Sequence, residues 1–126
     1  MSQTHHVAGH VLTLLRNGAE YFPRLIAAID GATQFVYLET YIYAADASGR
    51  MVSDALQRAA GRGVKVHVLL DGFGCADLPQ KWVGALRAAN VEILWFRPEI
   101  ARLRWHRRRL RRLHRKLAVV DGGIAF

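Results

Sequence analysis

Short runs of apolar and β-branched residues alternate along the chain with longer segments in which apolar residues recur every three or four positions. The first pattern is typical of buried strands and the second of amphipathic helices. Five runs are expected to be strands, namely 11–15, 35–43, 64–70, 91–96 and 117–120. Three segments are expected to be helices, namely 21–30, 51–60 and 78–89.

The order of these elements favours an α/β fold, in which a layered sheet carries helices on its faces. The run 64–70 alternates at first and then becomes wholly apolar, as is typical of a parallel strand. A length of 126 residues allows one compact domain rather than two. The last three residues, Ile124 to Phe126, have the character of a further strand. We therefore expect the chain to be cut within its domain.

The net charge of +8 is concentrated near the C-terminal end. Residues 1–100 hold nine basic and nine acidic side chains, whereas residues 101–126 hold nine basic side chains and one acid, Asp121. The excess lies in the basic run from Arg102 to Lys116, RLRWHRRRLRRLHRK. Such a cluster attracts a polyanion, either nucleic acid or a membrane surface rich in anionic lipid. Composition alone does not distinguish the two.

The single cysteine, Cys75, excludes an intramolecular disulfide and fits a reducing compartment. The first ten residues lack the apolar stretch of a signal peptide. No window approaches the roughly 20 apolar residues that a membrane-spanning helix needs. Insertion into a bilayer is therefore not expected, whereas attachment to its surface remains open.

The stretch from His114 to Asp121, HRKLAVVD, carries the candidate chemistry. In a strand, positions two apart point to the same face, so His114 and Lys116 would project side by side. An ammonium can hold the oxygens of a phosphate, and an imidazole can attack phosphorus or move a proton. Asp121 follows four apolar residues and could return to orient an imidazole. A chance pair within an arginine-rich stretch is the alternative.

The whole pattern, H-x-K-x4-D followed by two glycines, resembles the HKD signature of the phospholipase D superfamily. The likeness extends over residues 11–126. The segments similar to the N-terminal half of bacterial cardiolipin synthases are LRNGAEYFPRLIAAIDGA, VYLETYIYAADASGR, LQRAAGRGVKVHVLLDGFG, and FRPE with the basic stretch leading into LHRKLAVVDGGIAF. Residues 1–126 thus look like a first phospholipase D-like half-domain, truncated after its motif and lacking the second domain.

The resemblance implies phosphatidyl transfer by a ping-pong exchange through a phosphohistidine, without a metal or other cofactor. His114 would be the nucleophile or its acid/base partner, Lys116 the phosphate clamp and Asp121 the orienting carboxylate. The second imidazole would come from the missing C-terminal half or from another chain with an HKD motif. The substrate would be an anionic phospholipid of the phosphatidylglycerol type. The protein would be cytoplasmic and peripheral at the inner face of the cell membrane, and this chain alone would be nearly inactive.

Other polar residues carry less specific expectations. Glu39 lies in an apolar strand, where a carboxylate needs a partner. In the family it recurs near the floor of the site, and it either hydrogen-bonds within the fold or contacts substrate. Arg111 and Arg112 would line the mouth of the site, unless the basic run is only a solvated loop. Asp71 ends a strand where α/β folds usually bind ligands, and it either supports the site or caps its loop.

The remaining candidates are the other histidines and one tryptophan. His67 alternates within a strand and is expected to be structural. The scattered His5, His6 and His10 are not expected to form a metal site. Trp105, beside arginines, lies either at a lipid headgroup layer or against the fold.

Two other functions remain open. One is a phosphodiesterase or nuclease of the same superfamily, in which a homodimer supplies the second imidazole and the basic run holds nucleic-acid phosphates. The other is an inactive fragment, or a module that binds anionic lipid or nucleic acid. A second HKD motif encoded downstream would indicate a split or truncated synthase.

Overall fold

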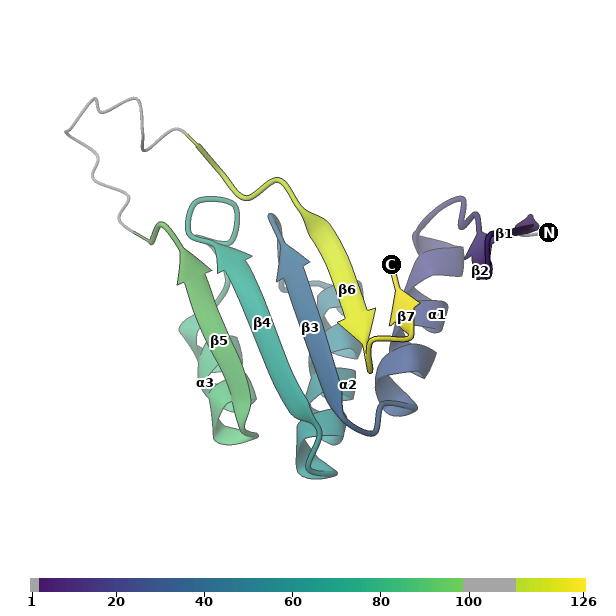
Figure 1. Ribbon diagram of the computed structural model, residues 1–126. Coiled ribbons are helices and arrows are strands. Elements are labelled where there is room, and N and C mark those ends of the chain that lie inside the picture. Colours follow the sequence, from purple (N-terminus) through teal and green to yellow (C-terminus); the bar gives the residue numbers. More distant parts are fainter. Residues whose placement is uncertain (1–2, 99–110) are drawn as a thin grey trace.

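A computed structural model describes residues 3–98 and 111–126 of the chain (Figure 1). Its main feature is a five-stranded sheet with the strand order β5-β4-β3-β6-β7. These strands are β3 (Phe35–Thr40), β4 (Lys65–Asp71), β5 (Val91–Phe96), β6 (Lys116–Val120) and β7 (Ile124–Ala125). A separate two-stranded sheet is formed by β1 (Thr4–Val7) and β2 (His10–Thr13). Residues 102–110 of the basic run, with Trp105, lie outside the described residues.

Three helices lie behind the five-stranded sheet in Figure 1 and cover one of its faces. They are α1 (Gly18–Asp30), α2 (Ala47–Gly61) and α3 (Gln80–Ala88). Burial alternates along the strands accordingly, so that in β3 Val36 and Leu38 are buried whereas Tyr37 is exposed. Each fully buried valine or leucine stabilises such a core by roughly 1.5–3 kcal/mol. The core between sheet and helices confirms the α/β layered class expected from the sequence.

The strand β6 reverses the direction of the sheet. β4 pairs in parallel with β3, and β5 in parallel with β4, whereas β6 pairs antiparallel with β3. The first residue of β6, Lys116, therefore pairs with the last residue of β3, Thr40. The residues just before β6 thus arrive at the C-terminal end of the parallel strands, which is the edge where α/β sheets usually bind ligands.

Two helices begin earlier than the apolar spacing predicts, because polar residues cap their N-termini. The side chain of Asn17 accepts the backbone N–H of Ala19 at 3.0 Å, and α1 begins at Gly18. The side chain of Asp46 accepts the backbone N–H of Gly49 at 2.8 Å, and α2 begins next to it. Such a cap is worth about 1 kcal/mol, enough to extend a helix beyond its apolar face.

The N-terminal strand prediction is corrected in one respect. The run expected at 11–15 forms β2, which pairs with β1 and does not join the five-stranded sheet. The two strands are joined by Ala8 and Gly9, whose φ angles of 46° and 82° are those of a tight hairpin turn. The strand expected at 35–43 also ends earlier, at Thr40, where the hydroxyl donates to the carbonyl of Ile42 at 2.8 Å.

Candidate active site

His114 and Lys116 both lie at the C-terminal end of β3. Lys116 pairs with Thr40, the last residue of that strand. The imidazole of His114 makes an edge-on contact with the ring of Tyr41, with the two centroids 4.2 Å apart. Both His114 and Lys116 are exposed, so a ligand can reach an imidazole and an ammonium at the same edge of the sheet.

A buried carboxylate at the end of β4 holds the chain just before His114. Asp71 is 0% exposed, and its Oδ2 accepts the backbone N–H of Leu113 at 2.8 Å. Its Oδ1 accepts the backbone N–H groups of Phe73 and Gly74 at 2.9 and 3.0 Å. Asp71 therefore caps its own loop and also anchors the segment that leads into β6. The two roles left open by the sequence are combined in one side chain.

The charge state of Asp71 follows from competing effects. Burial has the largest effect and raises the pKa of a carboxyl, because it disfavours the charged form. The backbone hydrogen bonds from Leu113, Gly74 and Phe73, together with the nearby charge of Arg112, outweigh it and lower the pKa of Asp71 below its usual value. Arg112 Nη1 lies 3.9 Å from Asp71 Oδ1. Asp71 is therefore ionised at neutral pH and anchors the site as a carboxylate.

Tyr41 provides a second support for His114. Gly74 lies against it so closely that a Cβ at this position would come within 2.0 Å of the Tyr41 carbonyl oxygen. The thiol of Cys75 donates to the same carbonyl at 3.2 Å, and burial raises the pKa of this thiol, so it keeps its proton. The turn after β4 thus holds Tyr41, which in turn contacts His114. Sequence reasoning missed Tyr41, because a contact between distant segments leaves no local pattern.

Asp121 lies at the other end of β6. Its Oδ1 accepts the backbone N–H groups of Gln34 and Phe35 at 2.8 and 2.9 Å. Its Oδ2 accepts the backbone N–H and the hydroxyl of Thr33 at 2.8 and 3.2 Å. The backbone hydrogen bonds from Thr33, Phe35 and Gln34 lower the pKa of Asp121 to about 2. This position does not match the expected role of orienting His114, since the carboxylate instead fastens the start of β3 to the end of β6.

The remaining charged candidates differ in how firmly the fold holds them. Glu39 Oε2 lies 3.4 Å from Arg115 Nη1, so this carboxylate has a partner within the chain. The Arg112 side chain is only 16% exposed, and its guanidinium lies 5.4 Å from the centroid of the Phe73 ring. Arg111 is exposed. Arg112 is therefore tied into the fold, whereas the Arg111 side chain faces solvent where an anionic ligand could reach it.

The other imidazoles that the structure describes lie elsewhere. His67 Nδ1 is 3.0 Å from Glu92 Oε2, and its ring stacks on Tyr37 with centroids 5.0 Å apart. Three further histidines belong to the β1–β2 hairpin, namely His5, His6 and His10. Within residues 3–98 and 111–126, no group of three or more His, Cys, Asp or Glu side chains could hold a metal ion. Chemistry that needs two imidazoles at this edge therefore requires one from outside the described residues.

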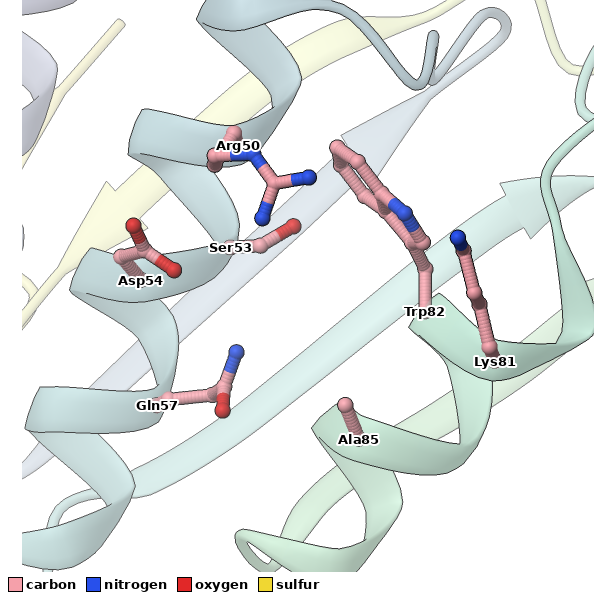
Figure 2. A pocket seen from close by; sticks show the side chains of 7 residues that line it. All are labelled: Arg50, Ser53, Asp54, Gln57, Lys81, Trp82 and Ala85. Carbon is pink, nitrogen blue, oxygen red and sulfur yellow. The ribbon is translucent and has the colours of Figure 1, made fainter.

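Among the hollows formed by the described residues, a larger and a smaller one flank α2. The larger, of about 570 Å³, lies beside Lys116 and is bounded by α1, α2 and the end of β3. The smaller, of about 290 Å³, lies between α2 and α3 (Figure 2). There Arg50 extends toward Trp82, with its guanidinium carbon 5.0 Å from the ring centroid, and Lys81 lies beside the indole. Of these two hollows, only the larger adjoins the segment from His114 to Asp121.

None of the helices in the described part of the chain is long and apolar enough to cross a bilayer. The site itself is an exposed edge of the sheet that carries an imidazole, of His114, and an ammonium, of Lys116. Such a pair can bind a phosphate and attack its phosphorus or move a proton to an adjacent oxygen.

Comparison with known proteins identifies similar domains. The family model "Cardiolipin synthase, PLD-like domain" matches residues 25–126. Cardiolipin synthase B of Escherichia coli strain K12 is 41% identical over 118 residues, which are 94% of this chain and 29% of that protein. Cardiolipin synthase 1 of Bacillus anthracis is 36% identical over 114 residues, which are 90% of this chain and 22% of that protein. The chain thus spans less than a third of these curated relatives.

Two solved structures have a similar fold. Nuc from Salmonella typhimurium, a phospholipase D family member, superposes with a TM-score of 0.59 at 18% identity, covering 84% of this chain and 60% of that one. Polyphosphate kinase from Porphyromonas gingivalis gives a TM-score of 0.53 at 24% identity, covering 79% of this chain and 15% of that one. At these identities the likeness concerns the fold alone.

Proposed function

Because the chain belongs to the phospholipase D-like domain family of cardiolipin synthases, we propose that it supplies one half of an active site for phosphatidyl transfer. The observation that carries the proposal is the position of His114 and Lys116 at the C-terminal end of β3, where Asp71 anchors the chain before them. The proposed substrate is an anionic phospholipid of the phosphatidylglycerol type. It would be taken from a membrane surface to which the protein attaches peripherally, at the inner face of the cell membrane.

The proposed reaction has two steps. In the first, the imidazole of His114 attacks phosphorus, and the bond from phosphorus to the headgroup alcohol breaks as a second imidazole protonates that alcohol. In the second, the headgroup hydroxyl of another phospholipid gives its proton to the second imidazole and attacks the phosphohistidine, which frees His114. Lys116 holds the non-bridging oxygens throughout. Two phosphatidylglycerol molecules would thus give cardiolipin and glycerol.

The second imidazole is proposed to come from another HKD-bearing half, in a longer chain or in a partner. The nucleophile and the proton donor act on opposite sides of phosphorus, so one imidazole cannot take both roles at once. In this proposal residues 1–126 are the first phospholipase D-like domain. Asp121 contributes by fastening the start of β3 to the end of β6, and not by contact with the reacting atoms.

The test is a two-component assay. The 126-residue chain is incubated with phosphatidylglycerol alone, and then together with the C-terminal part of a longer relative that carries a second motif. We expect little product from the chain alone, and cardiolipin with glycerol from the mixture. His114→Ala should lower the rate of the mixture by about 10²-fold or more. Lys116→Gln should lower it by about 10²–10³-fold, and the control His67→Gln should keep it.

Two results would contradict the proposal. An active mixture that retains its rate with His114→Ala would remove His114 from the chemistry. Robust cleavage of DNA or of a generic phosphodiester by the chain alone, abolished by His114→Ala, would favour a homodimeric phosphodiesterase instead. Residues 111–116 of the basic run would then bind nucleic-acid phosphates, and the affinity for nucleic acid would fall steeply as the salt concentration rises.

A further inference from the structure

The larger hollow is an apolar groove whose one end lies beside Lys116. Its volume of about 570 Å³ falls within the range of roughly 300–1,000 Å³ that is typical of small-molecule sites. Its lining includes Tyr21 and Phe22 of α1, Val52 of α2 and Leu38 of β3. These side chains offer apolar surface and few hydrogen-bonding groups, so the groove suits a hydrocarbon better than a sugar or a nucleobase.

The charged groups at the groove leave one cation at its end. Of its two carboxylates, Glu39 lies 3.4 Å from Arg115, and Asp46 accepts the backbone N–H of Gly49 at 2.8 Å. The ammonium of Lys116 has no ion pair among the residues that the structure describes. The groove therefore complements an amphiphile that carries one anionic group next to an apolar chain.

From this complementarity we infer that the groove binds one acyl chain of the phospholipid whose phosphate is held by Lys116. The inference rests on the proposed function and adds to it the part of the substrate away from the reacting atoms. An acyl chain bound in the groove would keep the glycerol backbone of the lipid close to the sheet edge and present its phosphate to His114. Affinity for the substrate would then depend on acyl-chain length as well as on the headgroup.

The test measures binding of a series of single-chain phosphatidylglycerols to the 126-residue chain. The lipids carry acyl chains of about four, six and eight carbons and are used below the concentration at which they form micelles. Glycerophosphoglycerol is the probe without an acyl chain. Burial of one methylene is worth about 0.8 kcal/mol, which corresponds to about a fourfold gain in affinity. We therefore expect the dissociation constant to fall by up to fourfold per methylene until the groove is filled.

A matched pair of variants locates the effect. Ile42 lines the groove and is 57% exposed, whereas Ile124 in β7 is 50% exposed and does not line it. Ile42→Asn should weaken binding of the eight-carbon probe by about fivefold, because it removes apolar surface that would contact the acyl chain. Ile124→Asn should leave binding unchanged, and neither variant should alter binding of glycerophosphoglycerol. Circular dichroism confirms that both variants are folded.

The outcomes separate this inference from the proposed function. If all probes bind equally well, or none binds, the groove does not take an acyl chain, whatever the result of the transfer assay. If chain length matters but Ile42→Asn and Ile124→Asn behave alike, the chain binds elsewhere and the inference is overturned. If affinity rises with acyl-chain length and only Ile42→Asn weakens binding of the long probe, the groove is the acyl site. That result stands even where the two-component assay gives no cardiolipin, in which case only the transferase proposal fails.

Discussion

Replacing the buried carboxylate of Asp71 by an amide, Asp71→Asn, changes the anchor before His114 with almost no change in volume. The carboxylate uses one oxygen for Leu113 and the other for Phe73 and Gly74, and all three partners are backbone N–H donors. An asparagine has one carbonyl oxygen and one NH₂ group. It can keep two of the bonds by turning its oxygen toward the turn after β4, and its NH₂ group then faces the N–H of Leu113.

The expected cost follows from that geometry. The bond from Leu113 to a charged acceptor is lost, and a buried donor is left facing another donor. A hydrogen bond to a charged group contributes about 1.5–3 kcal/mol, and an unsatisfied buried donor costs about 1–3 kcal/mol. These two figures describe the same loss, so the free energy of unfolding should fall by about 2–3 kcal/mol. The lost bond is the one next to His114, so activity should fall beyond what instability explains.

The assays are urea unfolding followed by circular dichroism, and the two-component transfer assay at a temperature where the variant is still folded. Asp77→Asn is the matched control, since Asp77 is exposed and lies in the same turn. A displacement of a reacting group by about 1 Å can cost about 10²-fold in rate. We expect the maximal rate of Asp71→Asn to fall with little change in the affinity for lipid. A variant as stable as the parent, with parental activity, would refute the anchoring role.

Two further predictions concern residues on either side of the site. Because the pKa of Asp121 is lowered to about 2 on folding, its contribution to stability is present above its ordinary pKa of 3.8 and is lost as the pH falls toward 2. Asp121→Asn should therefore flatten the decline in the urea midpoint between about pH 5 and pH 2, and an unchanged decline would contradict this. Arg112→Gln should lower the free energy of unfolding by about 1 kcal/mol through its lost contacts, whereas Arg111→Gln should leave it within about 0.5 kcal/mol. Arg111→Gln should instead weaken sedimentation with anionic liposomes by about fivefold, and equal effects of the two variants would contradict the distinction.

The local elements of this fold could be predicted from the sequence, because each depends on its own pattern. The apolar runs at 64–70 and 91–96 became β4 and β5 with nearly the expected bounds. The expected strand after Gly123 is present as β7. Helix starts were less accurate, because Asn17 and Asp46 act through a side-chain bond to the backbone and not through apolar spacing. The partner of the 11–15 run could not be predicted, since pairing depends on which strand lies nearby.

The candidate site was predictable only in part, for a similar reason. The spacing of His114 and Lys116 is a local property that can be found in the sequence, and both residues lie at the C-terminal end of β3. The position of Asp121 depends on the length and direction of β6, which carries its carboxylate to the start of β3. The roles of Asp71 and Tyr41 arise from contacts between segments that are far apart in the chain. No local pattern reports such contacts.

The antiparallel placement of β6 beside β3 also governs the order in which this domain can be built. The strands β3, β4 and β5 with their connecting helices are neighbours along the chain, and they can pair while the C-terminal residues are still being synthesised. By contrast, the bond between Asp121 and Gln34 joins residues 87 positions apart, so it cannot form until the chain through Asp121 has been made. Docking of β6 therefore depends on contacts between segments that are distant in the sequence. His114 lies just before β6 and contacts the ring of Tyr41, so we expect a chain in which β6 has not yet docked to lack this contact.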